Sequence, residues 1–361
     1  MSMNKIDISI YYDIKEDLEK YPDAWAYFIF GGRGRGKTYG TMNYVKSNNE
    51  DFVFLKRNIE DIQTLCAGGK DDEVDINLSP FKALNRDKGW NVKALSIAKG
   101  IGGFWDVKDG EFSGPPLGWL FALNGVTKYK GFELASDKEN QFMIFDEFVP
   151  NIYDRISRNE GKQLLDFYKT VSRDRIQRGL NEIKLICLSN ATNINSPIVS
   201  ELNITDYLAE MEMCDEGEMY IEEKKILLRK LPPFEDEAEK ETGLYKAMRD
   251  TDWGEMTWGN HFAYNDFSNV QKINLKNYTP VCSFIYKREI WYLYRKDGYY
   301  YMTRSRHNAQ KQYNLNRENE QKKAWLDILY DLRCRTIEEK VRYQTYSMYD
   351  LVVNYKQIFK L

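Results

Sequence analysis

Short apolar runs, each followed by polar residues, recur through the first two-thirds of the chain. The four clearest lie within 25–30, 51–58, 141–148 and 183–191. Continuous apolar runs of this length predict strands that are buried on both faces, as in a parallel sheet. Residues 161–178 carry apolar side chains at helical spacing, so a helix is expected to pack on that sheet. This alternation predicts an α/β fold, in which ligand groups stand at the carboxyl ends of the strands.

The segment between the second and third of these strands is less regular. Strands are expected near 101–107 and 119–124. The Gly- and Pro-rich stretch at 110–118 predicts a loop, and further loops are expected at 68–73 and 128–137.

A change of composition after residue 231 marks the domain boundary. Residues 204–213 and 219–227 predict a β-hairpin that closes the first domain. The two prolines at 232 and 233 and the acidic residues after them then interrupt the pattern. We therefore expect a first domain at 1–232 and a connector at 233–269.

The remaining residues, 270–361, predict a small α+β domain. Three strands rich in aromatic residues are expected, at 280–286, 290–294 and 299–303. The last two strands are joined through Asp297-Gly298, which is a strong hairpin signal. Helices are expected at 317–333 and 337–359.

The first strand runs straight into a glycine-rich loop that fits the phosphate-binding pattern G-x-x-x-x-G-K-[ST]. Its members are Gly31, Gly32, Arg33, Gly34, Arg35, Gly36, Lys37 and Thr38. Glycines let backbone N–H groups close on phosphate oxygens, which a Cβ would obstruct. Lys37 brings a charge to the β- and γ-phosphates, and the Thr38 hydroxyl is a ligand for Mg²⁺. The free positions Arg33 and Arg35 either face the γ-phosphate or a neighbouring subunit, or are solvated.

A second motif, Phe145-Asp146-Glu147-Phe148, ends the third strand with two adjacent carboxylates. In a phosphate-loop fold, the first carboxylate holds Mg²⁺, usually through its water shell. The second polarises the attacking water as a general base. We therefore assign metal binding to Asp146 and a catalytic role to Glu147.

Polar residues after the next helix and strand are candidates for the same site. Ser189 and Asn190 are placed to sense the γ-phosphate or to hold the attacking water. Arg173, Arg175 and Arg178 follow the helix. They either complement its dipole or supply an arginine finger to the γ-phosphate of a neighbouring subunit.

Five other positions leave two interpretations open. Tyr12 precedes the phosphate loop, where its ring either stacks on adenine or packs at the sheet edge. Lys56 and Arg57 end the second strand and either reach phosphate or form an ordinary strand-end charge pair. The loop lysines Lys128 and Lys130 either touch an anion or are solvated, and the solvated interpretation is favoured.

Composition excludes several classes of protein. The chain has 361 residues, and a hydrophobic content of 42% is sufficient for real cores. It has no run of about 18 apolar residues, so no membrane-spanning helix is expected. The acidic first twenty residues do not resemble a signal peptide. Five scattered cysteines without C-x-x-C spacing indicate a reducing compartment, with neither a disulfide framework nor a zinc site.

The net charge of −3 conceals an uneven distribution along the chain. Residues 270–361 hold 18 Lys and Arg against 9 Asp and Glu, so this segment carries +9 while residues 1–269 carry −12. A basic C-terminal domain suggests a polyanionic partner, and an ordinary solvated surface is the alternative.

Five motifs together resemble the DNA-packaging (encapsidation) ATPases of phi29-like tailed phages. They are Gly-x-Arg-Gly-x-Gly-Lys-Thr, Phe-Asp-Glu-Phe, Thr-Val-x-Arg-x-Arg, Cys-Leu-Ser-Asn-Ala and a late Trp-Gly-Glu-Met. Their order and spacing hold over nearly the whole chain, more specifically in its first domain than in its last. The resemblance implies a P-loop NTPase core of the ASCE type, a short helical connector and a small α+β C-terminal domain. The last domain would have an RNase H-like, vestigial nuclease fold that binds nucleic acid or the prohead.

The resemblance also implies roles for individual residues. The loop 31–38 would bind ATP, Asp146 and Thr38 would hold Mg²⁺, and Glu147 would be catalytic with Lys37. Arg173 would be the arginine finger, with Arg175 as the alternative, and Asn190 would be a sensor or coupling residue. Lys56 would be a trans-acting or DNA-facing cation.

The chain departs from the family pattern in a longer middle region (67–140) and a longer acidic connector. These departures leave Lys128 and Lys130 without an assigned place. The expected strands at 281–303 offer only Glu289 and Asp297 as carboxylates, too few for a two-metal nuclease, so we expect no nuclease activity.

The implied function is that of an ATP-driven motor that packages double-stranded viral DNA into the prohead. It would hydrolyse ATP at the subunit interfaces of a pentameric ring on the portal, in the host cytoplasm and away from any membrane. A requirement for a scaffold RNA stays open. Two alternatives remain at this stage: a terminase-like ATPase that also cleaves DNA, and a P-loop protein without a motor role.

Overall fold

The computed structural model describes residues 11–67, 78–134, 138–150, 156–157, 159–190, 193–233, 237–260, 262, 265–308 and 311–360. The expected loop at 68–73 lies outside this part of the chain. Two compact units are present, and each is described by itself. The first comprises Met1–Ile204 and Cys214–Tyr264, and the second comprises Thr205–Met213 and Asn265–Leu361. No described helix is long and apolar enough to cross a lipid bilayer.

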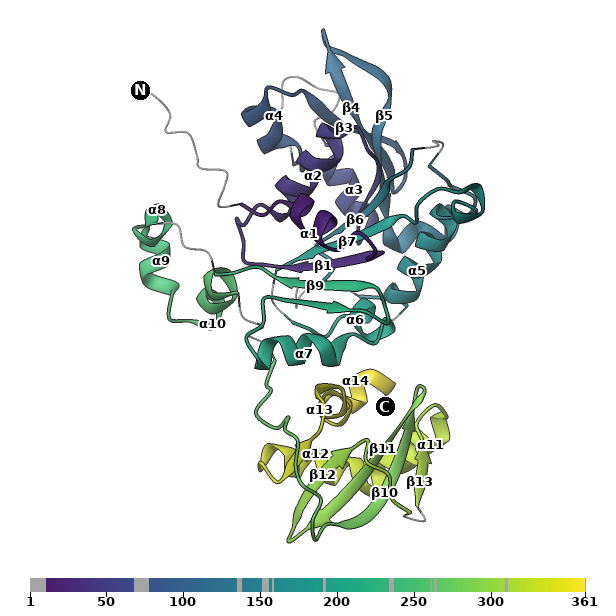
Figure 1. Cartoon of the computed structure of the whole chain (residues 1–361), viewed down its shortest axis with the longest axis vertical. Helices are drawn as coiled ribbons and strands as arrows, with labels where there is room; N and C mark the ends of the chain where they lie inside the picture. Colours follow the sequence, from purple (N-terminus) through teal and green to yellow (C-terminus); the bar gives the residue numbers. More distant parts are fainter. Residues whose placement is uncertain are drawn as a thin grey trace. The chain divides into compact units, whose positions relative to one another are not determined.

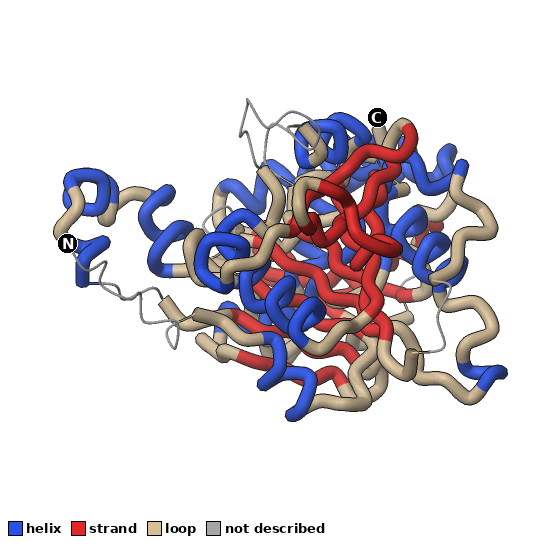
Figure 2. Tube along the Cα trace, turned by 90° about the horizontal axis from the view of Figure 1, so that it is seen from above, coloured by secondary structure: helices blue, strands red, loops and turns tan. Residues whose placement is uncertain are grey.

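The first unit is built on a sheet of nine described strands in the order β3-β4-β5-β2-β6-β7-β1-β9-β8. The central strands are β1 (Ala26–Phe30), β2 (Asp51–Lys56), β6 (Gln141–Asp146) and β7 (Lys184–Ser189). They pair in parallel with one another and with β5 (Glu111–Ala122) and β9 (Ile226–Lys230). The sheet runs through the unit as a twisted band (Figure 2).

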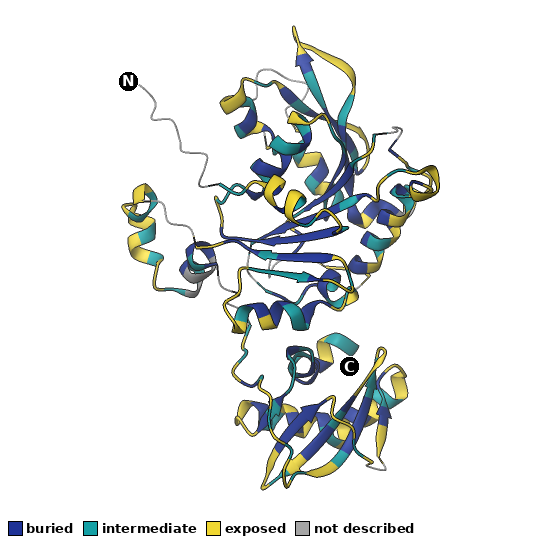
Figure 3. Ribbon diagram, viewed as in Figure 1, coloured by how far each residue is buried: buried dark blue, intermediate teal, exposed yellow. Residues whose placement is uncertain are grey.

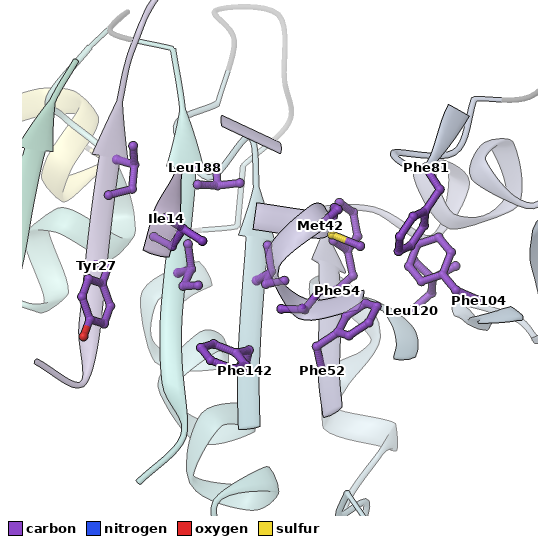
Figure 4. Close-up of a cluster of buried hydrophobic side chains, with 14 of the residues drawn as sticks. Ile14, Tyr27, Met42, Phe52, Phe54, Phe81, Phe104, Leu120, Phe142 and Leu188 are labelled. Atoms are coloured by element: carbon purple, nitrogen blue, oxygen red, sulfur yellow. The ribbon is translucent and has the colours of Figure 1, made fainter. Parts of the chain in front are cut away.

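Helices cover both faces of this sheet, which explains the continuous apolar runs of its strands. The helices of one face are α1 (Ile14–Lys20), α2 (Lys37–Ser47), α3 (Ile59–Leu65) and α4 (Lys82–Lys88). Alternate strand residues such as Tyr27, Phe54 and Phe142 belong to the same buried cluster as Met42 of α2 on this face (Figure 4). On the other face, α5 (Glu160–Val171) packs its Phe167 against Phe121. Figure 1 shows α5 and the group α1–α4 on opposite sides of the sheet.

Two expectations for residues 1–232 are wrong. Residues 204–213, expected as a strand, form the helix α7 (Thr205–Met213), because Leu208 and Met211 are buried at helical spacing among good helix formers. The expected loop at 110–118 belongs to β5, which forms a hairpin with β4 (Ile101–Lys108). The hairpin turn is Asp109-Gly110, and both residues have positive φ, as a tight hairpin turn requires.

The rest of the first unit consists of short elements. They are β3 (Val92–Ala98), η2 (Leu123–Lys128), η3 (Ile176–Arg178), α6 (Pro197–Glu201), β8 (Glu218–Ile221), α8 (Glu237–Lys240), α9 (Gly243–Met248), α10 (Asp252–Gly254) and η4 (Glu255–Gly259). The predicted hairpin of 204–213 with 219–227 therefore does not form, and the antiparallel hairpin present in this region is that of β8 with β9.

The second unit contains a sheet of five described strands in the order β13-β10-β11-β12-β14. Their bounds are Thr279–Tyr286 (β10), Glu289–Lys296 (β11), Tyr299–Thr303 (β12), Gln312–Asn314 (β13) and Val341–Tyr343 (β14). The predicted antiparallel meander is β10-β11-β12. The described helices after it are α11 (Glu318–Ala324), η5 (Trp325–Leu329), α12 (Tyr330–Ile337), α13 (Tyr346–Val353) and α14 (Tyr355–Phe359). Each unit has its own buried interior (Figure 3), and the predicted domain boundaries stay a prediction.

Candidate functional site

The glycine-rich loop joins the carboxyl end of β1 to the first turn of α2. Gly34 and Gly36 have φ of 77° and 75°, and Gly36 is the N-cap of α2. Glycine adopts these left-handed conformations with little strain. They curve the backbone of the loop around a central space. A pocket of about 410 Å³ opens there. Its lining residues are Arg33, Gly34, Arg35, Gly36, Lys37, Thr38, Tyr39, Asp146, Glu147, Val149, Ser189 and Asn190.

The side chain of Lys37 folds back across the phosphate loop. Its Nζ donates to the carbonyl oxygens of Gly31 at 2.7 Å and Gly32 at 2.8 Å, and lies 3.3 Å from Oδ1 of Asn190. Burial lowers the pKa of Lys37 to about 8, although the carboxylate of Asp146 opposes the shift. The ammonium group is therefore poorly solvated, which strengthens its attraction to any anion in the pocket.

The hydroxyl of Thr38 donates to Oδ1 of Asp146 at 3.0 Å. The structure thus joins the two sequence motifs, which lie far apart in the chain. Hydroxyl and carboxylate oxygens are the ligands that Mg²⁺ prefers, so Thr38 and Asp146 fit the predicted metal site.

Lys56, at the end of β2, pairs with both carboxylates of the second motif. Its Nζ lies 2.9 Å from Oδ2 of Asp146 and 3.0 Å from Oε2 of Glu147. Burial lowers the pKa of Lys56, but the two carboxylates outweigh burial and leave this pKa raised. Lys56 is therefore charged, and it holds the two acidic side chains side by side.

Glu147 points into the pocket because the residue after it is anchored in the core. Phe148 is fully buried, with its ring against Phe28 and Phe30. To bring Phe148 inward directly after the strand, Glu147 adopts a positive φ of 58°. Left-handed backbone at a residue other than glycine is uncommon, and it concentrates at functional sites. The Glu147 side chain remains 63% exposed.

Asn190 owes its position to the order of the strands. β7 lies between β1 and β6, so the residue after β7 stands between the phosphate loop and the carboxylates. Asn190 thereby reaches Lys37. Ser189 lines the pocket, and its carbonyl accepts from the N–H of Gly31 at 3.1 Å.

Arg57, in contrast to Lys56, faces away from the pocket. Its Nε donates to Glu160 at 2.9 Å and its Nη2 to the carbonyl of Phe148 at 2.8 Å, and both charged side chains are buried. Two interpretations were open for Lys56 and Arg57: contact with phosphate, or an ordinary charge pair at the end of the strand. Arg57 fits the second of these. Lys128 and Lys130 are exposed.

Arg173 and Arg175, which follow α5, also differ in where their side chains lie. Arg175 is buried and donates at 3.0 Å to each of the carbonyls of Lys138, Glu139 and Asn181. Arg173 is exposed and has no hydrogen bond or ion pair with any described residue. Arg175 thus braces the turn on which Arg173 is presented.

Tyr12 does not line the pocket. Its ring packs against the core cluster under α1 and α2, and its hydroxyl donates to Asp17 at 2.8 Å. Of the two interpretations of Tyr12, the structure therefore favours packing over adenine stacking. Burial, followed by the charge of Asp17, raises the pKa of Tyr12 well above its usual value.

Sequence reasoning missed two features of the site. Tyr39 lines the pocket, and its position directly after Thr38 was an available signal. The second feature is that the connector segment packs on the loop. A Cβ on Gly32 would lie 2.1 Å from the carbonyl oxygen of Thr257, which is itself buried. No signal in the sequence links these two positions.

The fold is a mixed α/β architecture with two sheets. The chain is similar over 97% of its length to a chain of the bacteriophage Phi-29 viral genome packaging motor assembly, with 17% identity, a TM-score of 0.65 and 99% of that chain covered. It is likewise similar over 97% of its length to a chain of the Phi-28 gp11 DNA packaging motor, with 19% identity, a TM-score of 0.62 and 98% of that chain covered. At these identities the similarity establishes the fold, and the resemblance found in the sequence is confirmed at that level. No family model matches the sequence, and a search of curated proteins finds no match.

Proposed function

We propose that this chain is the ATPase subunit of a motor that packages double-stranded viral DNA into a prohead. The observation that carries the proposal is the contact between Thr38 and Asp146, which unites a phosphate loop and a carboxylate pair in one pocket. The fold supports it, because both similar structures are genome packaging motors and both match over nearly the full chain.

ATP binds with its phosphates wrapped by the backbone N–H groups of residues 31–38. Lys37 turns from the carbonyls of Gly31 and Gly32 towards the β- and γ-phosphates, a short movement for a flexible side chain. Asn190 contacts Lys37 from the other side and so detects whether a γ-phosphate is present. Arg33 and Arg35 line the pocket and add positive charge around the phosphates.

Thr38 and Asp146 are the oxygen ligands that suit Mg²⁺. When bound, the cation neutralises the charge that develops on the β- and γ-phosphate oxygens. Glu147 takes a proton from the attacking water as general base, and Lys56 holds its carboxylate beside Asp146.

Arg173 acts on the pocket of a neighbouring subunit. It is exposed on a turn that Arg175 braces, and it has no partner among the described residues of its own chain. An arginine finger supplied in this way contributes about 10³–10⁵ in rate. The proposed assembly is a pentameric ring on the portal of the prohead, and hydrolysis in it changes the contacts between subunits.

DNA is held through its phosphates, without base readout, because a packaging motor must move any sequence. The charge of +9 on residues 270–361 favours this domain as a contact for nucleic acid, whether the DNA or a scaffold RNA.

The test is ATP hydrolysis by the full chain, alone and with DNA and proheads. A packaging motor is expected to hydrolyse ATP and to be strongly stimulated when both are added. The matched control is Asp146→Asn, which removes one metal ligand. Hydrolysis that is indifferent to DNA and proheads would contradict the motor, and no hydrolysis in any mixture would contradict the ATPase.

A further inference from the structure

Residues 11–13 cross the first turn of α2 over two glycines. The N–H of Tyr12 donates to the carbonyl of Arg35 at 3.0 Å. A Cβ on Gly40 would lie 2.1 Å from the carbonyl oxygen of Tyr12, so only glycine permits this approach. A Cβ on Gly36 would lie 2.8 Å from Cβ of Tyr11 and 3.1 Å from its ring. The crossing therefore places the ring of Tyr11 directly on the phosphate loop, while Tyr12 points to the core.

Tyr39 is the one aromatic side chain among the described residues that line the pocket. It follows Thr38 on α2 and is half-buried. Asp87 and Tyr11 are among the groups that act on its phenol. The two tyrosines and Asp87 are therefore close neighbours.

Asp87 belongs to α4, which contacts α2. It forms an ion pair with Arg86, whose Nε lies 2.7 Å from Oδ1 of Asp87, at the edge of the two tyrosines. Both oxygens of Asp87 accept from Arg86, and the hydroxyl of Tyr39 acts on the same carboxylate. An ionised carboxylate has about four lone-pair sites, so it keeps acceptor capacity beyond these contacts.

The two ends of the pocket differ in chemistry. One end carries Asp146, Glu147 and Asn190, where the γ-phosphate reacts. A nucleotide whose terminal phosphate lies there directs its sugar and base away from these groups, towards the start of α2. Tyr39 lines the pocket there, Tyr11 packs beside it on Gly36, and a nucleobase stacks well on aromatic faces.

We propose that Tyr39 and Tyr11 form the base subsite of the pocket, with adenine stacked on them and its amino group donating to Asp87. This inference rests on the proposed function, in which ATP is the substrate. It also replaces Tyr12, the residue that the sequence suggested for adenine stacking, with the residue before it in the chain.

The experiment compares the affinity of the full chain for Mg²⁺-ATP and for Mg²⁺-tripolyphosphate, which has the phosphates without a base. Tyr39→Leu and Tyr11→Leu are each expected to weaken ATP binding roughly 5- to 150-fold, the range of a lost base–aromatic stack, and to leave tripolyphosphate binding unchanged. Tyr39→Phe retains the ring and is expected to bind ATP as the wild type does.

The matched control is Tyr44→Leu, because Tyr44 is a half-buried tyrosine of the same helix that does not line the pocket. It is expected to leave both affinities unchanged. Asp87→Asn is expected to narrow the preference for ATP over inosine triphosphate, which carries an oxygen in place of the amino group.

Two results overturn the base subsite. In one, both leucine variants bind ATP as tightly as the wild type; in the other, they lose ATP and tripolyphosphate equally. If the proposed function itself is wrong, the wild-type chain binds neither ATP nor tripolyphosphate. That result is distinct from the two that overturn the base subsite.

Discussion

The ammonium of Lys56 lies 3.0 Å from the carboxylate of Glu147, and the same ammonium contacts Asp146 at 2.9 Å. One cation therefore fixes the spacing of the two acidic groups to which the sequence assigned different tasks. Since Glu147 is well exposed and Asp146 is not, only Glu147 is free to meet a water molecule from solvent.

Glu147→Gln is expected to abolish turnover while ATP still binds. The amide has nearly the shape of the carboxylate but cannot take a proton, and general bases of this kind contribute about 10²–10⁴ in rate. Steady-state hydrolysis and equilibrium ATP binding measure the two effects separately. Turnover at the wild-type rate in the purified variant would remove Glu147 from the mechanism.

The affinity for ATP is expected to fall as the pH rises above about 8, the pKa to which burial lowers Lys37. Only the protonated lysine attracts phosphate, so the loss approaches about tenfold per pH unit. Lys37→Arg stays charged in this range and is expected to show no such slope, whatever its absolute affinity.

The same pKa has a consequence for the ligand-free protein. The unfolded chain holds this proton more tightly than the folded one, so the free energy of unfolding is expected to rise as the pH increases from about 8 to 10.5. Chemical denaturation of the wild type and Lys37→Met would compare the two slopes, and equal slopes would contradict the buried charge.

Arg173→Ala and Arg175→Ala are expected to fail in different ways. Arg173 is exposed, so its loss leaves the melting temperature unchanged. In mixed rings, the Arg173→Ala variant should reduce ATP hydrolysis by more than the fraction of mutant subunits, because each mutant subunit also inactivates the site of its neighbour. Activity that falls only in proportion to that fraction would contradict action between subunits.

Arg175→Ala removes the donors to three carbonyls in a buried position. These hydrogen bonds are partly buried and contribute about 0.5–1.5 kcal/mol each, so a clear loss of thermal stability is expected. Calorimetry of the two variants side by side is the measurement. An unchanged melting temperature for Arg175→Ala would show that the turn is not braced in this way.

Gly32→Ala is expected to detach the connector segment from the phosphate loop. Its Cβ would collide with backbone, the carbonyl of Thr257, which cannot rotate away as a side chain can. Limited trypsin digestion should then cut at Lys240, Lys246 and Arg249 faster than in the wild type. Gly34→Ala is the control, because its Cβ meets nothing within 4 Å and only the positive φ is strained. Equal digestion rates for both variants would contradict the contact.

Sequence patterns predicted the central strands well because burial on both faces leaves a continuous apolar run. They failed for α7, where a short helix buries about as many apolar residues as a strand of the same length. They also failed for the β4–β5 hairpin, because Asp109-Gly110 is a hairpin signal hidden beside a run of glycines and prolines.

For the site, the motifs identified Lys37, Thr38, Asp146 and Asn190, which the structure brings into one pocket. The roles of the neighbouring residues depended on which way a side chain points. Lys56 and Arg57 are adjacent but face opposite ways, and so do Tyr11 and Tyr12. Sequence spacing cannot decide such a choice when both neighbours have the same chemistry.

The packing of Thr257 on Gly32 determines where this chain can be truncated without damage to the phosphate loop. Leu231 contacts Gly31, Asn260 donates to the carbonyl of Leu231, and the ring of Phe262 lies against Phe30. A fragment that stops at residue 232 would keep Leu231 but lose Thr257, Asn260 and Phe262, and so expose apolar surface beside the phosphate loop. A fragment that extends through Phe262 would retain these contacts, and it is the version suited to expression and ligand binding without residues 265–361.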